Sequence, residues 1–100
     1  MKKIVLATLV ILYLGPPVYS QTSQTYIDSG HRKQSQGDYR GAINDYTKAI
    51  ELKPNFATAY NNRGLAKILM GQKDSGCLDL SKAGELGNTE AYETIRQYCN

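Results

Sequence analysis

The sequence predicts an all-α fold, a short α-solenoid of two helix–turn–helix repeats followed by a C-terminal capping helix. Three observations support this prediction: an internal repeat of 34 residues, apolar residues at helical spacing within each unit, and no alternation typical of strands. The chain has 100 residues, which leaves room for one domain at most.

The internal repeat relates residues 23–56 to residues 57–90 without a gap, with nine identical positions among 34. The identical pairs are Tyr26/Tyr60, Gly30/Gly64, Lys33/Lys67, Gly37/Gly71, Asp45/Asp79, Lys48/Lys82, Ala49/Ala83, Glu51/Glu85 and Leu52/Leu86. Gly37 and Gly71 each separate two helical stretches, where a short turn must form. The repeat therefore predicts two equivalent helix pairs.

Each predicted helix has its own signal. In the first unit, Asp38 is a natural N-cap and Pro54 ends the second helix, which carries one apolar stripe. Apolar residues also mark the two helices of the second unit and a last helix at about 89–99. The apolar residues of the four helices are Ala42, Ile43, Tyr46, Ala49 and Ile50; Ala57, Tyr60, Gly64, Ile68 and Leu69; Leu78, Leu80, Ala83 and Leu86; and Ala91, Tyr92, Ile95, Tyr98 and Cys99.

Residues 37–55, GDYRGAINDYTKAIELKPN, resemble the second helix and turn of the tetratricopeptide repeat, a family with a 34-residue period. Tyr26 and Tyr60 match its large aromatic residue, and Gly30 and Gly64 match its small residue one turn later. The resemblance covers residues 23–90. The end of the second unit is also similar to the Sel1-like relatives of this family, which stack helix pairs in the same way.

The second unit departs from the family pattern at three positions. Gly76 stands where the first unit has Ala42, Gly84 replaces Ile50, and Asn88 replaces Pro54. Because a glycine inside a helix costs up to about 1 kcal/mol relative to alanine, the second helix of this unit is expected to be weaker.

The first twenty residues have the pattern of a signal peptide. Lys2 and Lys3 precede an apolar run at 4–14, and Val18-Tyr19-Ser20 predicts a cut before Gln21. The run covers about 16 Å as a helix, whereas a bilayer core needs roughly 30 Å. The sequence thus predicts that residues 21–100 form an exported domain, which is either secreted or located in a bacterial periplasm. No stable membrane insertion is expected after the signal peptide is removed. An uncleaved membrane anchor is the alternative.

Export would place the only two cysteines, Cys77 and Cys99, in an oxidising compartment. Antiparallel helices of similar length would bring the two sulfurs to the same level, so a disulfide is predicted that stabilises the domain by roughly 3 kcal/mol. Two free buried thiols are the alternative. A redox-active pair is disfavoured because the Cys-x-x-Cys spacing is absent.

Other chemistry has little support in the sequence. His31 is the only histidine, and neither a metal site nor a nucleotide or nucleophile motif is present, so no cofactor, no metal and no enzymatic activity are predicted. Residues 21–100 have a net charge of +1, which argues against nucleic-acid binding. Asp45 and Asp79 are expected to be solvated charges on the outer helices.

The resemblance implies that the first helices of successive units line a concave groove for a protein or peptide. The residues at those positions are Ile27, His31, Gln34, Thr58, Asn61, Asn62, Leu65, Ile68, Tyr92 and Ile95. Leu65, Ile68 and Ile95 have an alternative role in packing helices together. Chaperone-binding members use a Lys and an Asn in the first unit, where this chain has Ile27 and His31, so that function is not expected.

The sequence therefore predicts a small exported interaction module without catalytic activity, whose partner is a protein or peptide. Two alternatives remain. The chain could self-associate as a structural building block of the cell envelope, or it could be a thiol-active exported protein.

Overall fold

The structure is a computed structural model that describes the backbone of residues 17–100 and the side chains from Ser23 onward. Within this range the chain forms five α-helices and no strand, which confirms the all-α prediction. The helices are α2 (Pro17–Ser35), α3 (Tyr39–Leu52), α4 (Ala57–Leu69), α5 (Lys73–Glu85) and α6 (Glu90–Tyr98).

The predicted signal peptide lies mostly outside the described residues. Helix α2 begins at Pro17, so the predicted cleavage point before Gln21 falls within its first turns. Proline is common at the first position of a helix, because its missing N–H has no partner there in any case.

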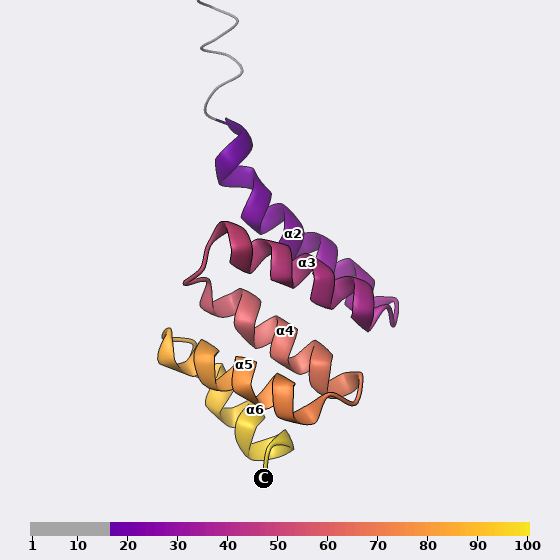
Figure 1. Cartoon of the computed structure of the whole chain (residues 1–100), viewed down its shortest axis with the longest axis vertical. Helices are drawn as coiled ribbons and strands as arrows, with labels where there is room; N and C mark the ends of the chain where they lie inside the picture. Colours follow the sequence, from indigo (N-terminus) through magenta and orange to yellow (C-terminus); the bar gives the residue numbers. More distant parts are fainter. Residues whose placement is uncertain (1–16) are drawn as a thin grey trace, which may run out of the picture.

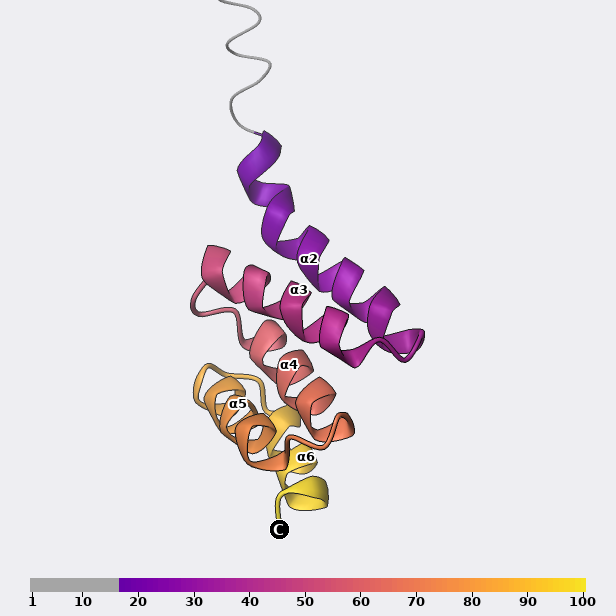
Figure 2. The same cartoon turned by 45° about the vertical axis from the view of Figure 1, so that its right-hand side comes forward.

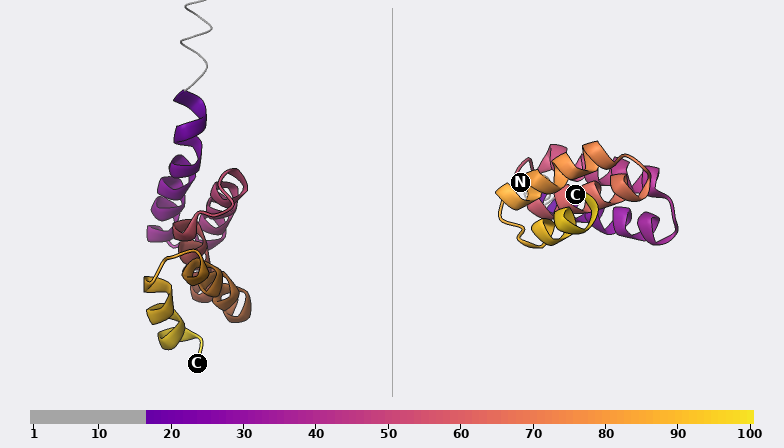
Figure 3. Two further views of the ribbon diagram at one scale, coloured as in Figure 1. Left: turned by 90° about the vertical axis from the view of Figure 1, so that its left-hand side faces the viewer. Right: turned by 90° about the horizontal axis from the view of Figure 1, so that it is seen from below.

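The five helices follow one another along the long axis of the molecule in chain order (Figure 1). Helices α2 and α3 form one antiparallel pair, α4 and α5 form the next, and α6 lies at the C-terminal end. A side view places α2 and α6 on one side of the stack and α3 and α5 on the other (Figure 3). This arrangement is the predicted short α-solenoid with a capping helix.

Three glycines end helices in the same way. Gly37, Gly71 and Gly87 have φ angles of +83°, +92° and +106°, in the left-handed region that glycine tolerates best. After each glycine the chain bonds back to the helix, as in the 2.8 Å bond from the Asp38 N–H to the Lys33 carbonyl. The tight turns let the next helix run back antiparallel.

The core consists of two clusters. The first joins α2, α3 and α4, and the second joins α5 and α6, with Tyr60 and Ile68 of α4 packed against it. Their buried members are Ile27, Ala42, Tyr46, Ala49, Ala59 and Ala66 in the first cluster and Leu80, Ala83 and Ala91 in the second. Leu78 lies on α5, as expected, but its side chain is 73% exposed and belongs to neither cluster.

Asp79 lies at the contact between α4 and α5, and the expectation that it is a solvated charge was wrong. Its side chain is buried and accepts two hydrogen bonds from the Arg63 guanidinium, at 2.7 Å from Nε and 2.8 Å from Nη2. Lys67 Nζ lies 2.9 Å from the same carboxylate. Two cations of α4 therefore neutralise one buried anion of α5.

Asp45 is also buried, so the same expectation was wrong for the first unit. The Ser29 hydroxyl donates to its carboxylate at 2.6 Å, and Lys33 Nζ lies 3.0 Å from it. Burial alone would raise the pKa of Asp45, but the Ser29 hydrogen bond and the Lys33 charge together outweigh it and lower the pKa.

The lowered pKa of Asp45 predicts a loss of stability in acid. A carboxyl whose pKa is depressed by folding stabilises the protein above its unfolded pKa, near 3.8, and loses that contribution as the pH falls through the folded value. Urea unfolding between pH 6 and pH 2.5 should therefore show a steeper decline below pH 4 for the native chain than for Asp45→Asn. The exposed Asp28→Asn is the matched control and should follow the native curve. Parallel curves for the native chain and Asp45→Asn would contradict the prediction.

The structure joins the predicted pair, Cys77 and Cys99, in a disulfide with an S–S distance of 2.08 Å. Cys77 lies in the second turn of α5, and Cys99 directly follows α6. Because these are the only cysteines of the chain, no free thiol is present in this state.

Candidate peptide-binding site

The predicted groove residues lie on three helices, α2, α4 and α6, and differ widely in exposure. His31, Thr58 and Tyr92 are exposed, whereas Gln34, Asn61, Asn62 and Leu65 are partly buried. Ile68 and Ile95 are partly buried and pack against the second core cluster. These two side chains therefore pack helices together, as the alternative interpretation expected.

The prediction that Ile27 lines the groove was wrong. Its side chain is only 2% exposed and belongs to the first core cluster, so a ligand on the surface does not reach it. A branched apolar side chain gains more from burial against the neighbouring alanines of that cluster than from exposure to water.

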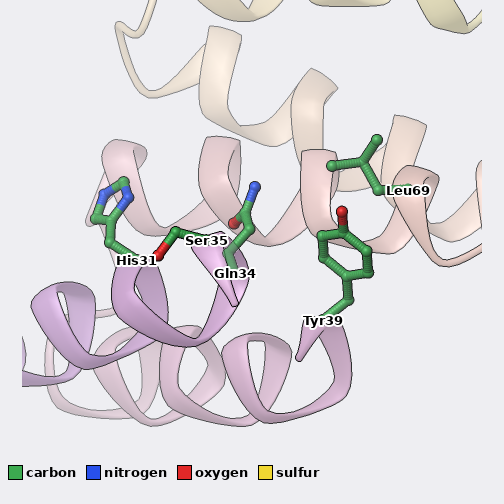
Figure 4. Close-up of a pocket in the computed structure, with 5 residues that line it drawn as sticks. All are labelled: His31, Gln34, Ser35, Tyr39 and Leu69. Carbon is green, nitrogen blue, oxygen red and sulfur yellow. The ribbon is translucent and has the colours of Figure 1, made fainter. Parts of the chain in front are cut away.

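An open pocket of about 320 Å³ lies where the end of α2, the start of α3 and the end of α4 meet. Figure 4 shows the residues that line it, and they come from all three helices. They are His31, Gln34, Ser35, Tyr39 and Leu69. We call this feature the α2–α4 pocket. It brings two predicted residues, His31 and Gln34, together with three that were not predicted.

Hydrogen bonds fix the two predicted residues of the α2–α4 pocket. The Asn62 amide nitrogen lies 3.1 Å from His31 Nε2, which links α4 to α2. The contact fixes the orientation of the His31 imidazole at the edge of the pocket. The His31 ring also meets Tyr46 edge to face, with 5.9 Å between the ring centroids.

A hydrogen bond from the buried Tyr46 orients Gln34, because the Tyr46 hydroxyl donates to Gln34 Oε1 at 2.9 Å. Burial, helped by the Asp45 charge, raises the pKa of Tyr46 to about 12, so this hydroxyl keeps its proton at neutral pH. The bond leaves the Gln34 amide nitrogen as a donor on the pocket side (Figure 4).

Three residues of the α2–α4 pocket were missed by sequence reasoning. Ser35 and Leu69 occupy the same position in the two repeats, one step beyond the predicted Gln34 and Ile68. Because one is a serine and the other a leucine, the two positions do not look alike in the sequence. Aligning the repeats at their 34-residue spacing would have paired them. Tyr39 is partly exposed, and its hydroxyl points to the pocket (Figure 4).

The pocket lining contains no acidic side chain, no lysine and no arginine. Within the described residues no group of three or more His, Cys, Asp or Glu side chains is placed to hold a metal ion. None of the helices in the described part of the chain is both long enough and apolar enough to cross a membrane. The α2–α4 pocket therefore offers polar side chains that can form hydrogen bonds and one leucine that can make apolar contacts.

The stacked helix pairs define the described chain as a helical-repeat protein, a class whose repeats form extended binding surfaces. A family model described as TPR repeat matches residues 30–71.

Known proteins carry the same repeat. The chain is 38% identical over 66 residues to the tetratricopeptide repeat protein 36 homolog of Nematostella vectensis, and the aligned region covers 66% of this chain and 36% of that protein. It is 40% identical over 57 residues to small glutamine-rich tetratricopeptide repeat-containing protein 2 of Mycosarcoma maydis, covering 57% and 16%. It is 34% identical over 50 residues to DnaJ homolog subfamily C member 7 of Mus musculus, covering 50% and 10%.

The chain is therefore similar to tetratricopeptide-repeat proteins, and its residues 30–71 match the repeat itself. It spans little more than a third of the length of the first of these relatives and far less of the other two. The Sel1-like character of the second unit stays a prediction.

Proposed function

We propose that this chain is a small exported, non-catalytic module that binds a segment of another protein along the face formed by α2, α4 and α6. The observation that carries the proposal is the α2–α4 pocket, an open pocket at the junction of the two repeats on that face.

The chemistry of the pocket supports an extended peptide segment as the ligand. The Gln34 amide nitrogen is a donor, the Tyr39 hydroxyl both donates and accepts, and the His31 imidazole adds a polar ring. Backbone carbonyl groups of a bound segment would satisfy these donors. Leu69, which is 46% exposed, offers an apolar wall for one of the segment's side chains.

A site-specific photo-crosslinker tests this proposal. We expect a crosslinker placed at Leu69 to capture a protein partner in cells of the source organism. The same group at Leu78, which is exposed on α5 and does not line the pocket, is the matched control. Adding Tyr39→Ala should reduce capture at Leu69 by at least severalfold, because it removes one pocket wall. Equal capture at both positions, or capture at Leu78 alone, would contradict binding at this face.

Export is the second component of the proposal, and it is supported by the basic start, the apolar run and the small residues before Gln21. The intact mass of the chain recovered from its native compartment tests it. We expect a chain that begins at Gln21, with a deficit of two protons that a reductant reverses. A chain that begins at Met1 and carries two free thiols would contradict export.

The alternative of self-association by end-to-end stacking has less support. Where α4 buries Ala59 and Ala66 against the first unit, the equivalent positions of α2 carry Thr25 and Arg32, both exposed. A polar face on the terminal helix is typical of the end of a repeat array. We therefore expect the sedimentation coefficient to be independent of protein concentration.

A further inference from the structure

Helix α6 has weak support of its own. It is nine residues long, whereas isolated helices shorter than about 12–15 residues are marginal in water. Ala91 is its only buried residue, and Ile95 is partly buried against the second core cluster. Glu90 in its first turn and Arg96 in its last turn complement the helix dipole, but such exposed charges contribute little.

Two covalent tethers hold α6 beside α5. At its start, the short turn at Gly87 connects it to the end of α5, and at its end the disulfide ties Cys99 to Cys77 near the start of α5. Helix α6 lies at the C-terminal end of the stack, where it contacts α5 and, less extensively, α4 (Figure 2). Without the disulfide, the turn at Gly87 would be the only covalent tether, and α6 would depend on the packing of Ala91 and Ile95.

We propose that oxidation of Cys77 and Cys99 docks α6 onto α5 and completes the binding face, and that α6 is undocked in the dithiol form. The reaction is thiol–disulfide exchange with a small or protein disulfide as oxidant. One cysteine thiolate attacks the oxidant and forms a mixed disulfide, and the other cysteine displaces the second half. The two cysteines lose two electrons and two protons, and the oxidant leaves as two thiols. Both cysteines are partly exposed, so the exchange is accessible in the folded chain.

Docking of α6 changes the surface in two ways. It covers the apolar side chains of Leu80 and Ala83, which are fully buried in the oxidised form. It also places Tyr92 against Gly84, whose missing side chain leaves room for the ring. The inference about the binding face rests on the proposed function, whereas docking of α6 does not.

Hydrogen–deuterium exchange on the full chain tests the docking. We compare the chain oxidised with glutathione disulfide and the chain reduced with dithiothreitol. We expect protection of the amides in residues 90–98 to fall at least tenfold on reduction, while residues 39–52 in α3 keep theirs. Unchanged protection of α6 would overturn the proposal, because the helix would then dock without the disulfide. Loss of protection in both segments would also overturn it, because reduction would then unfold the whole domain.

Two variants separate the disulfide from other effects of the reductant. Cys99→Ser, even under oxidising conditions, should show the exchange pattern of the reduced native chain and no response to dithiothreitol. Ser81→Ala, an exposed change on α5, should respond like the native chain. A Cys99→Ser chain with a protected α6 would overturn the proposal.

A crosslinker at Tyr92 connects the docking to binding. Capture of the partner at Tyr92 should disappear on reduction, while capture at Leu69 in the α2–α4 pocket persists. If neither position captures a partner, the proposed function fails while the exchange result still decides whether α6 undocks. If α6 undocks but capture at Tyr92 is unchanged, the link between oxidation and the binding face is wrong.

Discussion

An Asp79→Ala variant should lose about 3–5 kcal/mol of unfolding free energy, the range observed when one partner of a buried ion pair is removed. The carboxylate is buried and accepts both bonds of the Arg63 fork, with Lys67 on the same oxygen as Arg63 Nε. Its hydrogen bond and charge hold the pKa of Arg63 above its ordinary value, against the opposite effect of burial. Removing Asp79 leaves two cations largely shielded from water without an anion.

The loss would be a large share of the stability of so small a domain, since proteins are typically stable by only 5–15 kcal/mol. Thermal and urea unfolding of the oxidised chain measure it. The matched control is Glu85→Ala, an exposed carboxylate on the same helix, whose unfolding midpoint should stay near that of the native chain. A double-mutant cycle with Arg63→Ala should give a coupling energy of at least about 1 kcal/mol. Additive effects of the two substitutions would show that the pair is not coupled.

The burial of these carboxylates could have been predicted from the repeat. Lys33 and Asp45 are twelve residues apart in the first unit, and Lys67 and Asp79 recur at the same spacing in the second. A Lys–Asp pair that recurs in both repeats, on two antiparallel helices, indicates an ion pair between those helices. The interpretation from sequence considered each carboxylate by itself and missed the ion pair, because a single charge on a helix is most often solvated.

The fold was predictable because it depends on periodic features. The 34-residue repeat, the glycines between helices and the stripe of Ala42, Tyr46 and Ala49 each specify local structure, and the helices stack in chain order. The apolar residues of α5 do not all lie on one face of the helix. Leu78 and Leu80 are two residues apart and cannot share one face of a helix, so only Leu80 is buried.

The α2–α4 pocket was only partly predictable. Two of the residues predicted from family positions, His31 and Gln34, line it, but such positions do not show which side chains are buried in the core, as Ile27 is. The pocket also depends on where helices end. Tyr39 begins α3, and Leu69 is the last residue of α4, so their positions follow from the turns between the helices.

The glycines of α5 were interpreted from sequence as weak points, but the structure gives Gly76 a packing role. A Cβ atom at Gly76 would lie 2.6 Å from the Gly64 carbonyl oxygen and 2.7 Å from Ile68 Cγ1. The contact is reciprocal, since a Cβ atom at Gly64 would lie 2.7 Å from the Gly76 carbonyl oxygen. The backbones of α4 and α5 therefore touch at this point, and neither can move away without disturbing the other contacts between the two helices.

Gly76→Ala should consequently destabilise the domain although alanine favours the helix. The helix gains up to about 1 kcal/mol in propensity, but overpacking costs typically 1–3 kcal/mol, and a contact between two backbones lies at the upper end of this range. We expect a net loss of about 2 kcal/mol in urea unfolding with an unchanged slope. Gly84→Ala is the matched control on the same helix. Its Cβ atom would meet the outer atoms of the Tyr92 ring, which is 50% exposed and can shift more easily than a backbone, so the variant should lose less stability than Gly76→Ala. Equal effects of the two substitutions would mean that helix propensity, and not the contact between α4 and α5, decides the stability of this helix.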